Sequence, residues 1–342
     1  MNVFLLGMRR SGTTILYDAF GEDPELRRFY EPFREEAETV GGGSGVRAED
    51  LFTETRDLRH QFKRDIHPEV PLELFNHGGP RAPGLELHPV LPEWGVDLLR
   101  YLLGIAPRVL VKEVRLFRKV GDLHRVDPDA TLVHIVRDPR AVAGSMLLGR
   151  GRRHATRYAD ADAFFGAWTR RKLWSSGKIA KEVLAAGEHP GLERGVPDFM
   201  RPLIVWKAAW DGLREDGQRL FGERYVLVRL EDLRVDPEGE LHRIYDAIGR
   251  STPDGVRSWA EAHVRREPDI AWGDDPRWAE ATRLLGMTGA IEEAGYGEIS
   301  ALTGETKPIR LESPDAGASS RLDAAIGRAR HAVNRATGRA RP

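Results

Sequence analysis

The stretch that decides the fold reads Val3-Phe-Leu-Leu-Gly-Met-Arg-Arg-Ser-Gly-Thr-Thr-Ile-Leu-Tyr17. Its apolar run, Val3–Leu6, predicts a short buried strand, and the apolar-periodic segment that begins at Thr13 predicts a helix. A loop bounded by Gly7 and Gly12 joins the two. A strand, a glycine-bounded loop and a helix point backbone N–H groups and a helix N-terminus at an anion. The stretch therefore predicts an anion-binding loop.

The loop has the spacing of a Walker A phosphate-binding loop, with one substitution. Thr13 stands where that motif has Lys after the second glycine. Arg10 supplies positive charge from inside the loop instead. We therefore expect the loop to bind a phosphate-like group without belonging to an ordinary ATPase.

Three further apolar runs of strand length follow, at residues 108–112, 131–136 and 224–229. Continuous apolar runs separated by longer helical stretches are typical of a parallel sheet that is covered on both faces. Trp206 and Trp210, four residues apart, suit the buried face of one covering helix. The sequence thus predicts a P-loop-containing α/β fold with three layers, α/β/α, around a central parallel sheet.

Shifts in composition predict how the chain is organised. Residues 1–302 form the predicted α/β domain, with irregular helical and loop insertions at about 34–93 and 150–200 that would build the acceptor site. The first insertion is interpreted as a lid or substrate-facing structure rather than core, because it is rich in charge and proline. Residues 303–320 are predicted to be a linker, and 321–342 a basic amphipathic helix that docks on the body or on a second subunit of a possible homodimer. Contact of this helix with a membrane surface or a nucleic acid is the alternative.

Composition excludes several classes of protein. The 342 residues carry a net charge of −1, which gives no reason to expect a nucleic-acid partner. There is no Cys, so disulfides and thiolate metal sites are excluded. No apolar run reaches the roughly 18 residues that would cross a membrane. We expect a cytoplasmic protein without an integral membrane segment.

A second anion site is predicted where the run at 131–136 ends in Arg137-Asp-Pro139. Asp before Pro suits a helix start, with Asp138 as N-cap and Pro139 at the first helical position. Two turns later, Ser145 returns to the face that carries the helix start. Arg137 and Ser145 are therefore expected to hold one anion together, through a guanidinium fork and a hydroxyl donor.

With these two sites the chain resembles the sulfotransferases that use 3′-phosphoadenosine-5′-phosphosulfate (PAPS), particularly the carbohydrate and tyrosylprotein branches. Their 5′-phosphosulfate loop is similar to residues 10–14, and their 3′-phosphate segment is similar to 135–142 followed by Ser145. The family's "RYEDL…DP" segment resembles residues 228–237, and the end of its catalytic domain resembles Gly295-Tyr296. The Arg-Lys-Gly phosphate loop of the cytosolic small-molecule branch is missing from the sequence.

The resemblance implies transfer of a sulfuryl group from PAPS to a hydroxyl of a carbohydrate or other small-molecule acceptor. Adenosine 3′,5′-bisphosphate would be the product, and no metal would be required. The donor-binding residues that it implies are Arg9, Arg10, Ser11, Gly12, Thr13, Thr14, Arg137, Ser145 and Arg229.

Three residues are expected to carry the chemistry. Arg10 would neutralise the sulfonate and the leaving phosphate, and Lys112, at the end of its strand, resembles the family's Lys that bridges toward the leaving oxygen. Glu31 lies twenty-one residues beyond Arg10, a spacing that resembles the catalytic Glu of tyrosylprotein sulfotransferases, so it is the expected base. Glu31 as a structural N-cap or ion-pair residue is the alternative. Other bases that stay open are His60, His67, His77 and His88.

Two other functions stay open from the sequence. A P-loop nucleotide or small-molecule kinase would share the fold, but the loop Lys is missing and Arg137 stands where a Walker B Asp would follow the strand. A non-catalytic nucleotide-binding module would use the basic tail to recruit a partner.

Overall fold

The computed structural model describes residues 1–33, 47–70, 84–148, 158–167, 174–189, 191–192, 195–264 and 272–297. Within these residues the chain forms a five-stranded sheet in the order β2-β3-β1-β4-β5, and every neighbouring pair is parallel. The strands are β1 (Val3–Leu6), β2 (Arg27–Tyr30), β3 (Val109–Glu113), β4 (Thr131–Val136) and β5 (Tyr225–Arg229). The predicted parallel sheet is confirmed.

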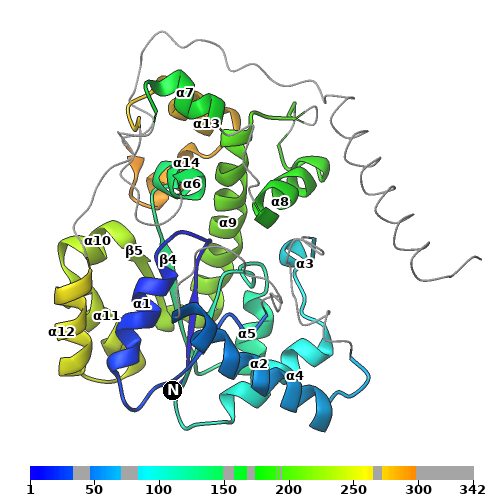
Figure 1. The fold of residues 1–342 in the computed structure, drawn as a ribbon, viewed down its shortest axis with the longest axis vertical. Coiled ribbons are helices and arrows are strands. Elements are labelled where there is room, and N and C mark those ends of the chain that lie inside the picture. The colour runs from blue at the N-terminus through cyan, green and yellow to red at the C-terminus, as the bar shows by residue number, and fades with distance from the viewer. Residues whose placement is uncertain are drawn as a thin grey trace, which may run out of the picture.

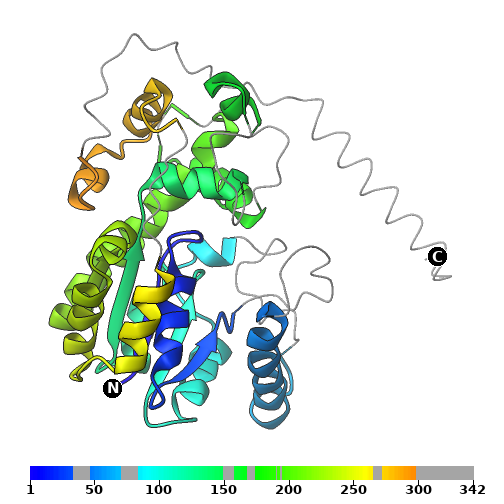
Figure 2. The same cartoon turned by 60° about the vertical axis from the view of Figure 1, so that its left-hand side comes forward.

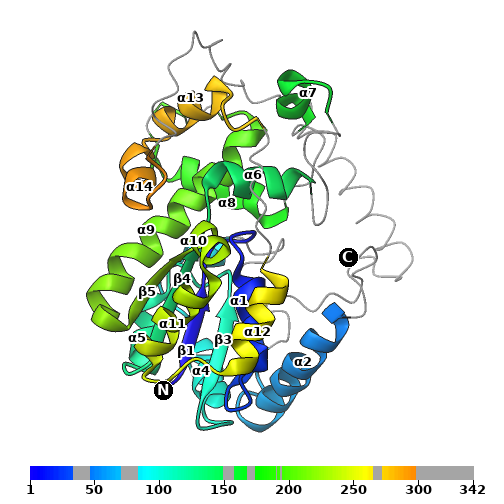
Figure 3. The same cartoon turned by 90° about the vertical axis from the view of Figure 1, so that its left-hand side faces the viewer.

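Side chains alternate between two cores on the two faces of this sheet. In β1, Val3 and Leu5 pack with α1 (Thr13–Ala19), α11 (Pro237–Ile248) and α12 (Asp254–His263). Phe4 and Leu6 point to the opposite face. The helices packed on that face are α4 (Glu93–Leu103), α5 (Val120–Val126) and α9 (Arg201–Phe221). Figure 3 shows the sheet between these two layers, as the predicted three-layer fold requires.

A second group of helices lies beyond the carboxyl ends of the strands, as Figures 1 and 2 show. It consists of α6 (Pro139–Leu148), α7 (Ala161–Gly166), α8 (Trp174–Ala185), α13 (Pro276–Leu284) and α14 (Thr288–Glu293). The 21-residue α9 runs from the sheet into this group. The shorter α3 (Gly84–Leu87) and α10 (Leu230–Val235) stand near the same edge.

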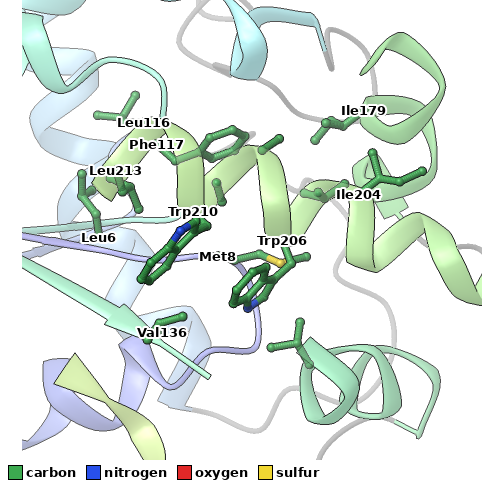
Figure 4. Close-up of a cluster of buried hydrophobic side chains, with 14 of the residues drawn as sticks. Leu6, Met8, Leu116, Phe117, Val136, Ile179, Ile204, Trp206, Trp210 and Leu213 are labelled. Atoms are coloured by element: carbon green, nitrogen blue, oxygen red, sulfur yellow. The ribbon is translucent and has the colours of Figure 1, made fainter. Parts of the chain in front are cut away.

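The pair at Trp206 and Trp210 is part of the core, as predicted. The two rings stack with centroids 5.8 Å apart and planes 3° apart. Figure 4 shows them beside Met8 of the anion-binding loop and Val136 at the end of β4. The face of α9 that carries the two tryptophans therefore packs against the anion-binding loop.

Two features of the fold were not predicted. The edge strand β2 carries Arg27 and Arg28, which interrupt its apolar pattern; the Arg28 guanidinium packs over the Tyr17 ring, 4.6 Å from its centroid. The expectation that the first insertion lies outside the core is wrong for α2 (Arg47–Asp65), a regular helix whose Phe62 is fully buried in the core. A charged, proline-flanked sequence concealed this helix, because its apolar positions are few.

The linker and the basic tail helix lie outside the described residues, so both stay predictions. Among the described helices, none combines the length and the apolar composition needed to cross a lipid bilayer.

Gly12 occupies a position that only glycine fits. Its φ is 100°, and a Cβ there would lie 2.8 Å from Cδ1 of Leu230. We expect Gly12→Ala to lower the free energy of unfolding by about 1–3 kcal/mol, measured by urea denaturation. Gly121→Ala in α5 is the matched control, because a Cβ there meets nothing within 4 Å; it should be neutral or stabilising. Equal stability of Gly12→Ala and the wild-type protein would contradict the loop geometry.

Candidate active site

The residues predicted to be functional gather at one edge of the sheet. Because all strands are parallel, their carboxyl ends meet at that edge, where open α/β sheets bind ligands. The anion-binding loop follows β1, Glu31 follows β2 and Arg137 follows β4. Lys112 pairs in register with both Leu5 of β1 and Tyr30 of β2. Candidate residues more than a hundred positions apart in the sequence therefore lie at the same edge of the sheet.

The two predicted anion sites are adjacent, and Arg10 joins them. Nε of Arg10 donates a hydrogen bond to Oγ of Ser145, 2.9 Å away on α6. Nη1 of Arg137 donates to the backbone carbonyl oxygen of Arg10 at 3.3 Å. Arg10 itself has a φ of 74°, a conformation that costs a non-glycine residue about 1–3 kcal/mol and is typical of functional loops. The geometry thus brings Arg10, Arg137 and Ser145 together.

Two buried polar atoms at this point lack a partner within the part of the chain that the structure describes. They are Oγ of Ser11 in the loop and Nε of Arg137. Burial lowers the pKa of Arg137, and the neighbouring Arg234 lowers it further. A buried hydroxyl and a buried guanidinium nitrogen that lack a hydrogen-bond partner are costly in free energy. An anion bound at the loop and one bound at Arg137 would each supply a missing partner, so both residues fit a phosphate group.

Glu31 is buried between two cations at the same edge. Its carboxylate pairs with Nζ of Lys112, and Nη1 of Arg115 lies 3.1 Å from its Oε2. Nζ of Lys112 also lies 3.9 Å from the centroid of the Tyr30 ring, and the Tyr30 hydroxyl lies 3.1 Å from Oγ1 of Thr14 in the loop. The predicted base and the predicted bridging lysine are thus in direct contact.

Arg9 makes its contacts on the side of the first insertion. Its guanidinium forms a two-pronged ion pair with the buried carboxylate of Glu86 on α3; Nη1 lies 2.7 Å from Oε2, and Nη2 contacts Oε1. A role for Arg9 in donor binding stays a prediction. Glu86 was missed by sequence reasoning, because a Glu within a proline-rich stretch carries no signal of burial.

Arg229 lies beside the end of the described chain. Its guanidinium lies 4.6 Å from the centroid of the Tyr296 ring. The Tyr296 hydroxyl donates to Oε2 of Glu231 at 2.6 Å, and Oε1 of Glu231 accepts from the backbone N–H of Asp138 at 3.1 Å. The segments around Arg229 and Tyr296 therefore brace the start of α6. Contact of Arg229 with the donor stays a prediction.

The start of α6 is fixed from two more directions. The Asp138 carboxylate accepts from the backbone N–H of Arg140 at 2.8 Å, which confirms the predicted N-cap. Nε1 of Trp206 donates to the carbonyl oxygen of Arg137 at 2.8 Å. Arg137 is therefore held in place through its backbone, while its side chain faces the site.

Three of the histidines, His67, His88 and His134, contact other protein groups. His134 is a core residue: its Nδ1 lies 2.8 Å from the Tyr225 hydroxyl, and burial lowers its pKa to about 3. Among the alternative bases, His67 contacts Glu69 and Asp97, and the hydrogen bond to Glu69 raises its pKa. His88 contacts the Val90 backbone and His60 lies on α2, while His77 is outside the described residues.

No group of three or more acidic or histidine side chains in the described ranges is arranged to hold a metal ion. The expectation that no metal is required stays a prediction.

Comparison with known proteins gives a family match over the region that holds most of this site. The model of a sulfotransferase family matches residues 2–177, slightly more than half of the 342 residues. The match includes the anion-binding loop, Glu31, Lys112 and Arg137. No curated protein matches the chain.

Several solved structures are similar at low identity. A sulfotransferase from Mycobacterium tuberculosis is 15% identical, with a TM-score of 0.42, over 83% of this chain and 76% of that one. A sulfotransferase domain from the curacin biosynthetic pathway is 14% identical, with a TM-score of 0.40, over 95% and 96%. A sulfotransferase from Alicyclobacillus acidocaldarius is 16% identical, with a TM-score of 0.38, over 83% and 93%.

Proposed function

The chain belongs to the sulfotransferase family, and from that premise we propose that it transfers a sulfuryl group from PAPS to a hydroxyl of a carbohydrate or glycosylated small-molecule acceptor. The observation that carries the proposal is the pair of adjacent anion sites joined through Arg10. A donor with one phosphate for each site fits this pair of cations. A hydroxyl acceptor is supported by the resemblance of residues 10–14 to the loop of the carbohydrate and tyrosylprotein branches, and the carbohydrate is the acceptor that we propose.

Two sets of residues would bind the two phosphate-bearing ends of the donor. The loop amides and hydroxyls of Gly12, Thr13 and Thr14 would hold the 5′-phosphosulfate end, where a helix N-terminus favours negative charge. Arg137 and Ser145 would hold the 3′-phosphate, with the unpartnered Nε of Arg137 supplying one charge-assisted hydrogen bond. When bound, PAPS supplies a sulfuryl group attached to a stable leaving phosphate.

In the proposed transfer, a bond forms between the acceptor oxygen and sulfur while the bond between sulfur and the 5′-phosphate oxygen breaks. Glu31 takes the proton from the acceptor hydroxyl, so the products are a sulfate ester and adenosine 3′,5′-bisphosphate. Arg10 and Lys112 neutralise the charge that builds on the leaving oxygen. Positioning and electrostatics therefore do most of the work, as in phosphoryl transfer.

The contact between Lys112 and Glu31 links donor binding to the proton transfer. In this structure Lys112 is the counter-charge of the Glu31 carboxylate. An anionic sulfonate would compete with that carboxylate for the Lys112 ammonium. Glu31 would then lose one of its two cations and become a stronger base once the donor is in place.

A transfer assay with sulfur-labelled PAPS tests the proposal. The full chain is incubated with sugars, glycolipids, phenols and peptides in turn, and label in the acceptor is counted. We expect label in at least one hydroxyl acceptor, most strongly in a sugar-containing one. The same assay with adenosine 5′-phosphosulfate, which lacks the 3′-phosphate, should give little transfer. Magnesium-dependent consumption of ATP in place of sulfate transfer would contradict the proposal.

A further inference from the structure

The buried carboxylate of Glu86 stands between the two halves of the candidate site. It is fully buried on α3, inside the first insertion, and it forms the two-pronged pair with Arg9 of the loop. Oε1 of Glu86 also lies 4.0 Å from Nε of Arg115. Arg115 in turn contacts Glu31 at 3.1 Å. Arg9, Glu86, Arg115, Glu31 and Lys112 thus form one ion-pair network.

The position of Glu86 is fixed by its surroundings. Nζ of the fully buried Lys119 donates to three backbone carbonyl oxygens around α3, those of Leu85 at 2.6 Å, Glu86 at 3.2 Å and His88 at 2.7 Å. These three hydrogen bonds hold the backbone from which the Glu86 side chain projects, and the two-pronged pair with Arg9 holds the carboxylate itself. Burial raises the pKa of Glu86, while the Arg9 charge lowers it. Both oxygens of Glu86 face N–H donors of Arg9, an arrangement that fits the ionised carboxylate.

We propose that Glu86 is a positioning residue that sets the pH at which Glu31 takes up a proton, by drawing Arg115 partly away from Glu31. The inference rests on the proposed function for the role of Glu31 as base. If Arg115 paired with Glu31 alone, the Glu31 carboxylate would be held more firmly in its charged form and would accept a proton less readily. Glu86 provides a second carboxylate for that guanidinium.

Other charged groups lie close to Glu31 and Glu86 and affect their charge states. The charged groups that face Glu31 and Glu86 from the surrounding elements are Arg9, Arg59, Lys112, Glu113, Arg115 and Lys119. Arg59 lies on α2, and its Nη1 donates to the Pro32 carbonyl oxygen at 3.1 Å. Glu113 lies 3.8 Å from Nη1 of Arg115 and is a third carboxylate for that guanidinium. The proposed effect of Glu86 is therefore partial.

Two substitutions should move the titration of Glu31 in opposite directions. Glu86→Gln removes a negative charge and leaves Arg115 to Glu31, so Glu31 should titrate about one pH unit lower. Arg9→Met removes the other partner of Glu86, so Arg115 should move toward Glu86 and Glu31 should titrate at higher pH. If the two substitutions only loosened the insertion, the Glu31 titration should shift in the same direction in both variants.

The measurement is a carboxyl-carbon NMR titration of the full chain, in which the Glu31 signal is assigned by its loss in Glu31→Gln. It needs no donor or acceptor, so it stays informative even if sulfate transfer fails. Glu86→Asp, which keeps the charge, should restore most of the wild-type titration. Asp122→Asn is the matched control. Asp122 of α5 also contacts the first insertion, by accepting from the Leu91 N–H, but it pairs with Arg125 rather than with the Glu86 network. This substitution should leave the Glu31 titration unchanged.

Activity gives an independent second measurement. A base must be ionised to act, so kcat/KM should rise with pH through the titration of Glu31. In Glu86→Gln that rise should occur at lower pH and level off about threefold lower, because a weaker base transfers the proton less well. If Glu86→Gln fails to fold, Arg9→Met decides, since its side chain is partly exposed. Unmoved titrations, or shifts of the same sign in both variants, would overturn the proposal.

Discussion

Replacing Glu31 by Gln is expected to lower kcat for sulfate transfer by about 10²–10⁴-fold, the usual contribution of a positioned general base. Gln has nearly the same shape but cannot take the acceptor's proton at neutral pH. Lys112 and Arg115 would lose their shared counter-charge, so the variant should also be less stable. Steady-state kinetics with labelled donor, beside thermal unfolding, separates the two effects.

Glu113→Gln is the matched control for this loss of stability. Glu113 is equally buried and lies 3.8 Å from Arg115, but its oxygens accept from the backbone N–H groups of Phe33 at 2.7 Å and Val114 at 3.0 Å. It should destabilise the fold while keeping turnover within about tenfold of the wild-type protein. If Glu31→Gln kept nearly full kcat, Glu31 would be only an ion-pair residue and the base would have to be sought elsewhere.

Replacing Arg137 by Ala is expected to weaken binding of adenosine 3′,5′-bisphosphate by about 10²-fold, or roughly 2–3 kcal/mol. The reason is the loss of a half-buried cation whose buried Nε has no partner among the described residues. Binding of AMP, which lacks the 3′-phosphate, should change only a few-fold. The two dissociation constants, measured by calorimetry on the full chain, give the loss of discrimination directly.

Arg234→Ala controls for a general loss of positive charge. Arg234 is close enough to Arg137 to lower its pKa, but it is assigned no contact with the donor. Its loss should weaken both nucleotides by the same small factor, which salt should reduce further. A similar loss for both nucleotides in Arg137→Ala would mean that Arg137 contributes only to the general field.

Local patterns were enough to predict much of this site. The glycine-bounded loop, the strand ends and the two-turn spacing from Asp138 to Ser145 depend on neighbours in the sequence, and each is present in the structure. The direct contact of Arg10 with Ser145 was not predicted, because the two sites were derived separately. It arises from the parallel pairing of β1 with β4, which sets the loop beside α6.

The parts that sequence reasoning missed depend on long-range packing. Glu86 is 77 residues from Arg9 in the sequence. The two residues can form an ion pair only because α3, which is fixed by Lys119, packs beside the loop. β2 was hidden by its two arginines, since an edge strand exposes one side and needs no continuous apolar run. Tyr296 resembled a family feature in the sequence, but its contact with Glu231 becomes visible only in three dimensions.

The most direct test of the account is the ratio of two affinities in the unmodified protein. Isothermal titration calorimetry with adenosine 3′,5′-bisphosphate and with AMP compares a ligand that reaches both anion sites with one that reaches only the loop. Because Arg137 and Ser145 should add charge-assisted hydrogen bonds to the 3′-phosphate, the bisphosphate is predicted to bind about 10²-fold more tightly or better. Equal affinity for the two nucleotides would contradict a donor site built from two anion subsites.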